Sequence, residues 1–212
     1  MSLYQIFSIL ILALFAFISC QKHIKADKYS IADLLAKSLK QDTLEYSEWK
    51  TREGNFFFFK SGNFLSENTK NALYIHSDND SVFILKLYKQ EKQKWMEMTF
   101  VDSIHISPLY FDLKFRDFDF DGEKDIYIQT NVTNGSGISS GIVFIQKNNK
   151  LFLNEDLSYL GNITADTTGK TIISEKIIFC KSDGQKEICK TRHEWKGDNL
   201  VTKSIDCPCE SE

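Results

Sequence analysis

Short apolar runs alternate with polar residues along most of this chain, and small or polar residues interrupt them at intervals of about ten residues. Phe111, Leu113 and Phe115, for example, alternate with charged residues, which is the period of a half-buried strand. This pattern predicts an all-β fold of antiparallel sheets, arranged irregularly as in a propeller or a sandwich. The segments predicted as strands are Phe56–Phe59, Val82–Tyr88, Trp95–Phe100, Phe111–Phe115, Ile126–Ile128, Ile142–Gln146, Leu151–Leu153, Thr171–Ser174, Glu175–Cys180, Ile188–Trp195 and Leu200–Ser204.

Only one segment has a helical period. Ser30 can cap a short N-terminal helix that ends near Gln41. Apolar residues recur along one side of it at Ile31, Leu34, Leu35 and Leu39. The four consecutive aromatic residues of Phe56–Phe59 predict a strand that is buried on both faces.

Two connections between predicted strands differ in length. Val82–Tyr88 and Trp95–Phe100 form a predicted hairpin, with Phe83, Leu85 and Leu87 on one face and Met96, Met98 and Phe100 sharing it. The segment from Asn131 to Gly141 is rich in glycine and serine and too long for a tight hairpin. It predicts a mobile loop between two strands, and a binding rim is the alternative.

The N-terminus has the pattern of an export signal. The run Ile6–Ile18 is almost purely apolar but too short to span a bilayer comfortably, and Ser19-Cys20 follows it. This ending resembles the lipobox of bacterial lipoproteins, which implies that Cys20 is lipidated. We therefore expect a signal peptide over residues 1–20, a tether over 21–29 and a single β-rich domain over 30–212. A plain signal peptide or a membrane helix is the alternative for the leader, and an N-terminal lobe before about residue 105 is the alternative for the domain.

The charge of the chain argues against nucleic acid as a partner. Lys and Arg total 26 against 29 Asp and Glu, and the formal net charge is −3. No dense basic block stands out along the sequence, so electrostatic capture of an anionic polymer is not predicted.

One acidic loop carries the clearest chemical signal. Carboxylates occupy the first, third, fifth and ninth positions of Asp117–Asp125, and Gly122 occupies the sixth. This spacing can surround one Ca²⁺ with hard oxygen ligands. The predicted ligands are the side chains of Asp117, Asp119, Asp121 and Asp125 and the backbone carbonyl of Glu123. An EF-hand pair would need an acid at the twelfth position, where Ile128 stands, so we expect an EF-hand-like calcium loop between two strands.

Two other interpretations of this loop remain. It can be an acidic surface turn that binds nothing, or the metal can be catalytic. His and Cys residues do not stand beside the loop at ligand spacing, which favours a structural ion. His23, His76, His105 and His193 lie in unrelated contexts, and no Ser or Cys has the surroundings of a nucleophile, so the chain is not predicted to be an enzyme.

Four cysteines lie in the last fifth of the chain, at Cys180, Cys189, Cys207 and Cys209. An even number in an exported protein predicts disulfides. Turns near Gly184 and Gly197 can bring both Cys180 and Cys207 toward Cys189, and the sequence allows three pairings. The pairing that we favour is Cys180–Cys189 with Cys207–Cys209, and a zinc cluster completed by His193 is the alternative.

The layout from Phe111 to the C-terminus resembles a family of small bacterial exported proteins and lipoproteins. These proteins have a single D-x-D-x-D-G-x-x-D loop followed by short strands, here including Lys170–Ser174 and Trp195–Val201. Some relatives are periplasmic immunity proteins against lysozyme-type toxins. The resemblance implies a calcium-stabilised, lipid-anchored envelope protein, on the periplasmic face or the cell surface, that binds and inhibits a secreted or periplasmic cell-wall hydrolase. The alternative function is calcium-dependent binding of a glycan at the cell surface.

Overall fold

The computed structural model describes residues 30–50, 55–77, 82–133, 135–148, 150–181 and 184–209. The predicted signal peptide, Cys20 and the tether lie outside the described residues. The chain divides into two units, residues 1–33 and 34–212. In the first unit, Ser30 Oγ accepts a hydrogen bond from the Asp33 N–H at 3.1 Å, so Ser30 caps α2 (Ile31–Ser38) as predicted. None of the helices in the described part of the chain has the length and apolar character of a membrane span.

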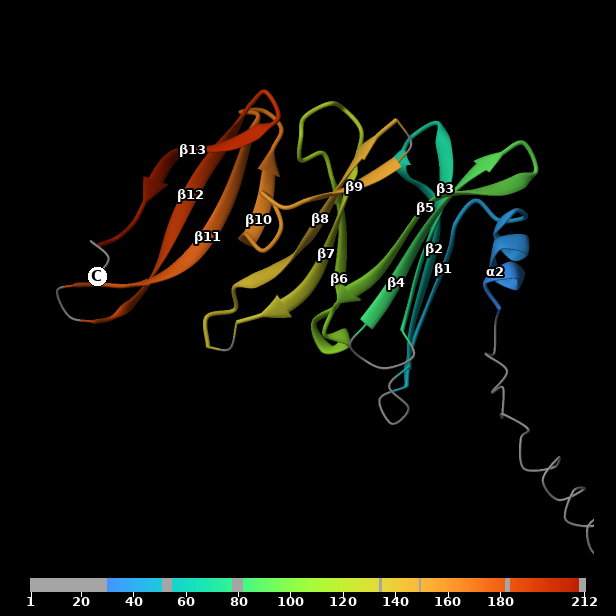
Figure 1. The fold of residues 1–212 in the computed structure, drawn as a ribbon, viewed down its shortest axis with the longest axis horizontal. Coiled ribbons are helices and arrows are strands. Elements are labelled where there is room, and N and C mark those ends of the chain that lie inside the picture. The colour runs from blue at the N-terminus through green and yellow to red at the C-terminus, as the bar shows by residue number, and fades with distance from the viewer. Residues whose placement is uncertain are drawn as a thin grey trace, which may run out of the picture. The chain divides into compact units, whose positions relative to one another are not determined.

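The second unit contains three antiparallel sheets, which confirms the predicted all-β fold (Figure 1). Within each sheet, every strand pairs with the next strand in the sequence. The strands of the first sheet are β1 (Leu44–Lys50), β2 (Asn55–Ser66), β3 (Thr69–Ser77), β4 (Val82–Glu91) and β5 (Lys94–His105). After the 3₁₀ helix η1 (Pro108–Tyr110), the second sheet has β6 (Asp112–Arg116), β7 (Asp125–Val132), β8 (Ser139–Lys147) and β9 (Lys150–Asn154). The third has β10 (Gly161–Asp166), β11 (Thr171–Phe179), β12 (Lys186–Lys196) and β13 (Asn199–Asp206).

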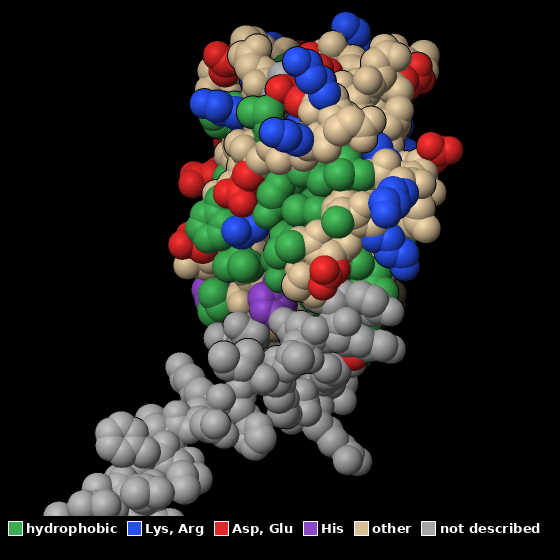
Figure 2. Space-filling model, turned by 90° about the vertical axis from the view of Figure 1, so that its right-hand side faces the viewer, with side chains coloured by type: hydrophobic (Ala, Val, Ile, Leu, Met, Phe, Trp, Pro, Cys, Tyr) green, Lys and Arg blue, Asp and Glu red, His purple; other side chains and the backbone are tan. Residues whose placement is uncertain are grey.

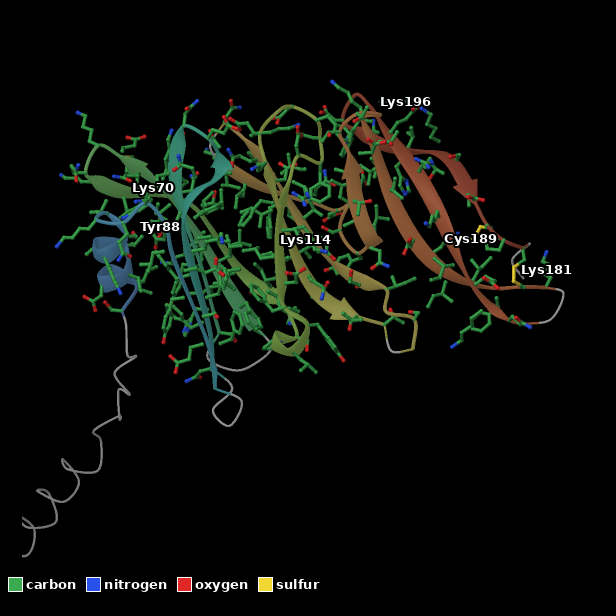
Figure 3. The ribbon with its side chains drawn as sticks, turned by 180° about the vertical axis from the view of Figure 1, so that it is seen from behind. Lys70, Tyr88, Lys114, Lys181, Cys189 and Lys196 are labelled. Atoms are coloured by element: carbon green, nitrogen blue, oxygen red, sulfur yellow. A yellow bond between two sulfur atoms is a disulfide. The ribbon has the colours of Figure 1, made fainter. Side chains whose placement is uncertain are left out.

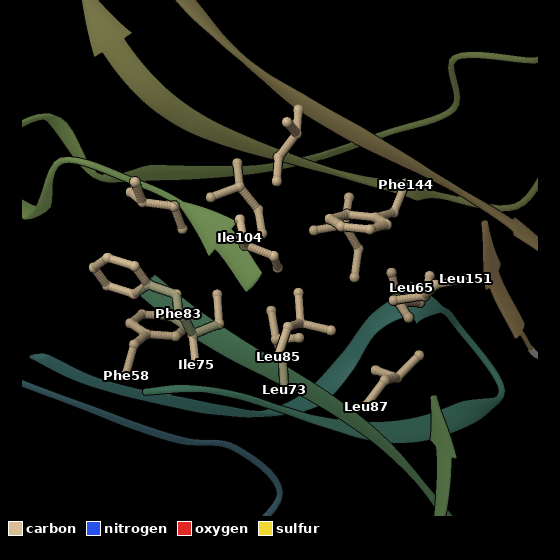
Figure 4. Close-up of a cluster of buried hydrophobic side chains, with 14 of the residues drawn as sticks. Phe58, Leu65, Leu73, Ile75, Phe83, Leu85, Leu87, Ile104, Phe144 and Leu151 are labelled. Carbon is tan, nitrogen blue, oxygen red and sulfur yellow. The ribbon is translucent and has the colours of Figure 1, made fainter. Parts of the chain in front are cut away.

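The first and second sheets pack face to face on a large apolar core (Figure 4). Alternate residues of β3, β4, β7 and β8 enter it, as the two-residue period of a strand requires. Figure 4 shows Phe83, Leu85 and Ile75 of the first sheet facing Phe144 of the second. Phe83, Leu85 and Ile75 are completely buried, so this interface is the main apolar core of the protein.

The second sheet is the middle layer, because its opposite face packs against the third sheet. Tyr127 and Val143 point away from the first core and join Ile163 and Ile172 of the third sheet in a second apolar cluster. Strands β7 and β8 are therefore buried on both faces. This explains why Ile142–Ile145 forms a continuous apolar run.

Aromatic side chains line the outer face of the first sheet. Phe57 points away from the core that holds Phe56 and Phe58, and its ring lies 5.3 Å from that of Tyr74 and 5.6 Å from that of Tyr46. Figure 2 shows apolar side chains gathered on this side of the molecule. Phe56–Phe59 thus contributes to both faces of its sheet, although Phe57 is only half-buried.

The predicted hairpin of β4 and β5 exists, but a register shift changes which side chains of its second strand face the core. Phe83, Leu85 and Leu87 are buried in the core as expected. The expectation that Met96, Met98 and Phe100 share this face is wrong for Phe100, which pairs with Lys86, while Thr99 pairs with Leu87 and Val101 with Leu85. Met96 pairs with Lys89, which lies on the same side of β4 as Leu87. The register shifts between Leu87 and Tyr88, and a bulge of this kind changes which side chains face the core. Phe100 consequently remains about half exposed, at 51%, and Met96, near the end of the hairpin, is 47% exposed.

Other boundaries also differ from the predicted ones. Strands β1, β3 and β10 were not predicted, and the two segments predicted between Thr171 and Cys180 form the single strand β11. The long loop expected from Asn131 to Gly141 is shorter, because β7 continues to Val132 and β8 begins at Ser139. The Thr133 N–H donates to the Ile138 carbonyl at 2.8 Å and closes the remaining connection as a hairpin.

The four cysteines form two disulfides, but the favoured pairing is wrong. The bonds join Cys180 to Cys209 and Cys189 to Cys207. The antiparallel register of β12 and β13 explains this pairing, because continuing it places Cys189 opposite Cys207. None of the four thiols is left as a zinc ligand. In Figure 3, the disulfides lie at one end of the third sheet and Lys196 marks the other. Two disulfides indicate folding in an oxidising compartment outside the cytoplasm.

Candidate metal centre

The acidic loop connects β6 to β7 and is fastened on both sides. Phe118 is buried in the cluster between the second and third sheets, and its carbonyl accepts a hydrogen bond from the Trp195 indole N–H at 2.8 Å. On the other side of the middle sheet, the Lys124 N–H donates to the carbonyl of Leu65 in the first sheet at 3.2 Å. Gly122, at φ 95°, adopts a left-handed conformation that lets the loop turn sharply. The loop thus contacts all three sheets.

Three of the predicted ligands converge. One carboxylate oxygen each from Asp117, Asp119 and Asp125 lies within 4.8 Å of the other two, which is close enough for a single ion to bind all three. Asp117 Oδ2 accepts a hydrogen bond from the Gly122 N–H at 2.9 Å. Its other oxygen, Oδ1, is buried and has no hydrogen-bond partner among the residues that the structure describes. A buried, unpaired carboxylate oxygen is costly, and a cation at this point would remove that cost.

Asp125 is the anchor of this centre. It is completely buried, and its two oxygens accept hydrogen bonds from the backbone N–H groups of Phe118 at 2.7 Å and Gln146 at 2.9 Å. Burial raises the pKa of Asp125 to about 7 despite these two bonds, and the charges of Asp119 and Asp117 act in the same direction. The metal-free site therefore disfavours negative charge, and a bound cation would offset this effect.

The pKa of Asp119 is also raised, for similar reasons. Burial, and next the charge of Asp121, raise the pKa of Asp119 above its ordinary value. The Lys147 ammonium lies 3.7 Å from its carboxylate and offsets only part of this effect. The side chain of Asp119 is 11% exposed, so water screens its charge little.

The side chains of the other two predicted ligands lie outside this cluster. Asp121 is exposed, and its Oδ1 accepts the Glu123 N–H at 2.8 Å. Glu123, which we predicted to use its backbone carbonyl, is also exposed, and its carboxylate accepts a hydrogen bond from Gln146 Nε2 at 3.0 Å. The structure thus supports a centre of three carboxylates that can hold a metal ion, with Asp121 and Glu123 at its solvent side.

A cleft of about 580 Å³ adjoins this centre. Asp119 and Asp121 of the loop form one side of it, and the β8–β9 and β12–β13 hairpins form the others. These three connections lie along the same edge of the stacked sheets (Figure 1). No local pattern in the sequence marks the cleft, because its other lining residues come from segments far apart in the chain. Among them are Lys147, Phe152, Leu153, Trp195 and Asp198.

A hydrogen bond between a serine and a histidine was also not predicted. Ser174 Oγ lies 2.9 Å from His193 Nε2, and Thr202 Oγ1 lies 3.5 Å from Nδ1 of the same ring. The hydroxyl of Thr202 stands where a catalytic triad has a carboxylate. Both Ser174 and His193 are buried, and we interpret the pair as part of the packing of the third sheet.

This histidine makes the stability of the protein depend on pH. Burial lowers the pKa of His193 below its ordinary value of 6.5, so the unfolded chain takes up the proton first as the pH falls. The contribution is fully present above pH 6.5 and is lost toward lower pH. Asp125, whose raised pKa favours the folded state at lower pH, acts in the opposite direction, so the effect of His193 is measured as a difference between two proteins. We expect the free energy of unfolding in urea of the unaltered protein, relative to that of His193→Gln, to fall between about pH 7.5 and pH 5. The same pH dependence in both proteins would contradict the assignment.

A scan of protein-family models finds no match to this chain, and neither the curated proteins nor the solved structures provide one. The function must therefore be argued from the metal centre, the cleft and the sequence.

Proposed function

We propose that this protein is a calcium-stabilised, lipid-anchored and non-catalytic binding module of the bacterial cell envelope. The observation that supports this most directly is the convergence of Asp117, Asp119 and Asp125 within 4.8 Å, with one oxygen of Asp117 buried and without a hydrogen-bond partner in the described part of the chain. Carboxylates without nitrogen or sulfur ligands favour a hard cation. Ca²⁺ also accepts backbone carbonyls and water, which the exposed side of the loop at Asp121 and Glu123 can offer.

A structural role for the ion follows from where the loop is attached. Through Phe118 and Lys124, the loop contacts the third and first sheets, while Asp125 begins a strand of the middle sheet. An ion that fixes this loop would therefore stabilise the packing of all three layers. Ligand binding to the folded state alone raises stability by mass action, so calcium should act on the whole unit.

The location of the module is supported by two features. The apolar run Ile6–Ile18 and Cys20 support a lipid anchor at the envelope, and the two disulfides support an oxidising compartment. A lipid anchor would hold the β domain at a membrane surface without a spanning segment.

Two kinds of partner are candidates for this module. The resemblance to immunity lipoproteins supports inhibition of a cell-wall hydrolase. The cleft beside the metal centre favours the second candidate, a glycan, because exposed apolar side chains and polar groups meet there. For both candidates, the module binds its partner and catalyses no reaction.

The calcium requirement can be measured by thermal unfolding. After metal removal with a chelator, adding Ca²⁺ at about 100 times its dissociation constant should stabilise the protein by roughly 2.7 kcal/mol. For a chain of this size, this corresponds to a rise of about 5–10 °C in melting temperature. Isothermal calorimetry should report the heat of calcium binding in parallel.

The matched controls are carboxylate-to-amide substitutions. Asp119→Asn combined with Asp121→Asn should abolish both the heat and the rise in melting temperature, because amides lack the charge that holds the ion. Asp112→Asn, which changes an acid on the neighbouring strand β6, should leave both unchanged. Absence of both effects in the unaltered protein would refute the proposed function.

A further inference from the structure

The cleft beside the metal centre has walls of two different chemistries. Phe152 and Leu153 lie on the edge strand β9 and are 52% and 53% exposed. Such exposure of large apolar side chains is costly unless something covers them. Phe152 pairs with Ile145 and so lies on the face of the middle sheet that the third sheet covers elsewhere. The third sheet leaves this part open, and the cleft results.

Trp195 links the cleft to the metal loop. Its indole N–H donates to the Phe118 carbonyl at 2.8 Å, and the same side chain lines the cleft. The ring is thus held in one orientation by the loop that the ion would fix. An aromatic ring fixed in advance binds a partner without losing further conformational entropy.

The charge of the cleft depends on the metal. Three carboxylates line it, from Asp119, Asp121 and Asp198, and Lys147 is the only cation among the described residues that line it. Without metal the cleft is therefore strongly acidic. A divalent cation bound by Asp119 and its neighbours would offset two of these negative charges. The loaded cleft then combines apolar surface with hydrogen-bonding groups and is less acidic than the metal-free cleft.

These features match one class of ligand. A sugar ring presents apolar C–H groups on its faces, which pack on aromatic rings, and hydroxyl groups around its edge. Carboxylates accept hydrogen bonds from such hydroxyls, and Asn148 and Asn154 add amide donors and acceptors to the cleft. A volume of about 580 Å³ lies within the ordinary range of small-molecule sites.

We infer that this cleft binds a neutral oligosaccharide and does so only when the adjoining centre holds calcium. The inference rests on the proposed function, since it assigns the ligand of the same module. It also separates sugars from cationic ligands. A basic peptide would prefer the acidic, metal-free cleft, whereas a neutral sugar would prefer the loaded one.

The test uses the full-length chain in a detergent without a sugar headgroup. Neutral tetrasaccharides of glucose, mannose, xylose and N-acetylglucosamine are titrated with calcium and with chelator, and tryptophan fluorescence is recorded. We expect at least one to change the fluorescence saturably in calcium only, and Trp195→Phe to remove the change. Phe152→Ala should weaken binding about tenfold by removing the apolar wall. Phe100→Ala, which removes an equally exposed phenylalanine from β5, should bind as the unaltered protein does.

Several results would overturn the inference. These are no binding by any tetrasaccharide in calcium, equal binding with and without calcium, or no effect of Phe152→Ala. Binding of trilysine in chelator without sugar binding, or inhibition of a lysozyme-type hydrolase that Phe152→Ala leaves intact, would assign the module to another class of partner. Calorimetry on the same samples reports calcium uptake, so loss of the sugar site with intact uptake leaves the proposed function standing.

Discussion

Replacing Asp125 by alanine is expected to abolish calcium binding and to lower the free energy of unfolding of the metal-free protein by roughly 2–4 kcal/mol. The second effect arises because the carboxylate accepts the N–H groups of Phe118 and Gln146 in a completely buried position. Alanine leaves both donors without a partner, and each unpaired buried donor costs about 1–3 kcal/mol. The comparison is made at about pH 5, below the raised pKa of Asp125, where relief of its buried charge offsets only part of this loss. Urea unfolding in chelator measures the stability, and calorimetry measures the calcium heat.

Asp121 provides the matched control for this result. It lies four residues earlier in the same loop but is exposed. Asp121→Ala should weaken calcium binding while changing the stability of the metal-free protein by no more than about 0.5 kcal/mol. If Asp125→Ala were as stable in chelator as the unaltered protein, the hydrogen-bonding role assigned to Asp125 would be wrong. If it still bound calcium normally, the metal centre itself would be wrong.

The contrast between these two acids shows how far the sequence could predict the centre. The spacing of acids and the glycine placed the loop between two strands, and the structure has β6 and β7 there. The spacing treats Asp121 and Asp125 alike, however. Which acid is buried depends on Gln146, a residue 21 positions away on β8. Contacts of this range are set by the packing of sheets, which a local pattern does not contain.

The same reason explains which strands could be predicted. Strand β4 alternates between buried and half-buried positions, so its residues show the two-residue period. Strand β10, Gly161–Asp166, has one buried residue among polar neighbours and lacks such a signal. The register shifts between β4 and β5 determine which side chains of β5 face the core. The register of β12 with β13 determines which cysteines pair. The cleft was out of reach altogether, since Phe152 and Trp195 meet only through tertiary packing.

The middle sheet also contains a residue whose role only the structure reveals. Gly141 was predicted to end a loop, but it lies inside β8 opposite Gln129. A Cβ at this position would lie 2.2 Å from the Ile128 carbonyl oxygen and 2.8 Å from the Tyr127 ring. Both groups belong to β7, which is buried on both faces, so neither can move away freely. Glycine is therefore required for the close approach of these two strands.

Gly141→Ala is consequently expected to destabilise the protein by at least about 3 kcal/mol, which corresponds to a fall of roughly 6–12 °C in melting temperature. The added methyl group must separate β7 from β8 or displace Tyr127, and either change disturbs the cores on both sides of the middle sheet. Thermal and urea unfolding in saturating calcium measure the loss. Ser140→Ala changes the preceding residue, whose side chain is half-buried, and should stay within about 0.5 kcal/mol of the unaltered protein. Equal stability of the two variants would show that the middle sheet can yield at Gly141, and the tight pairing of β7 with β8 would then be incorrect.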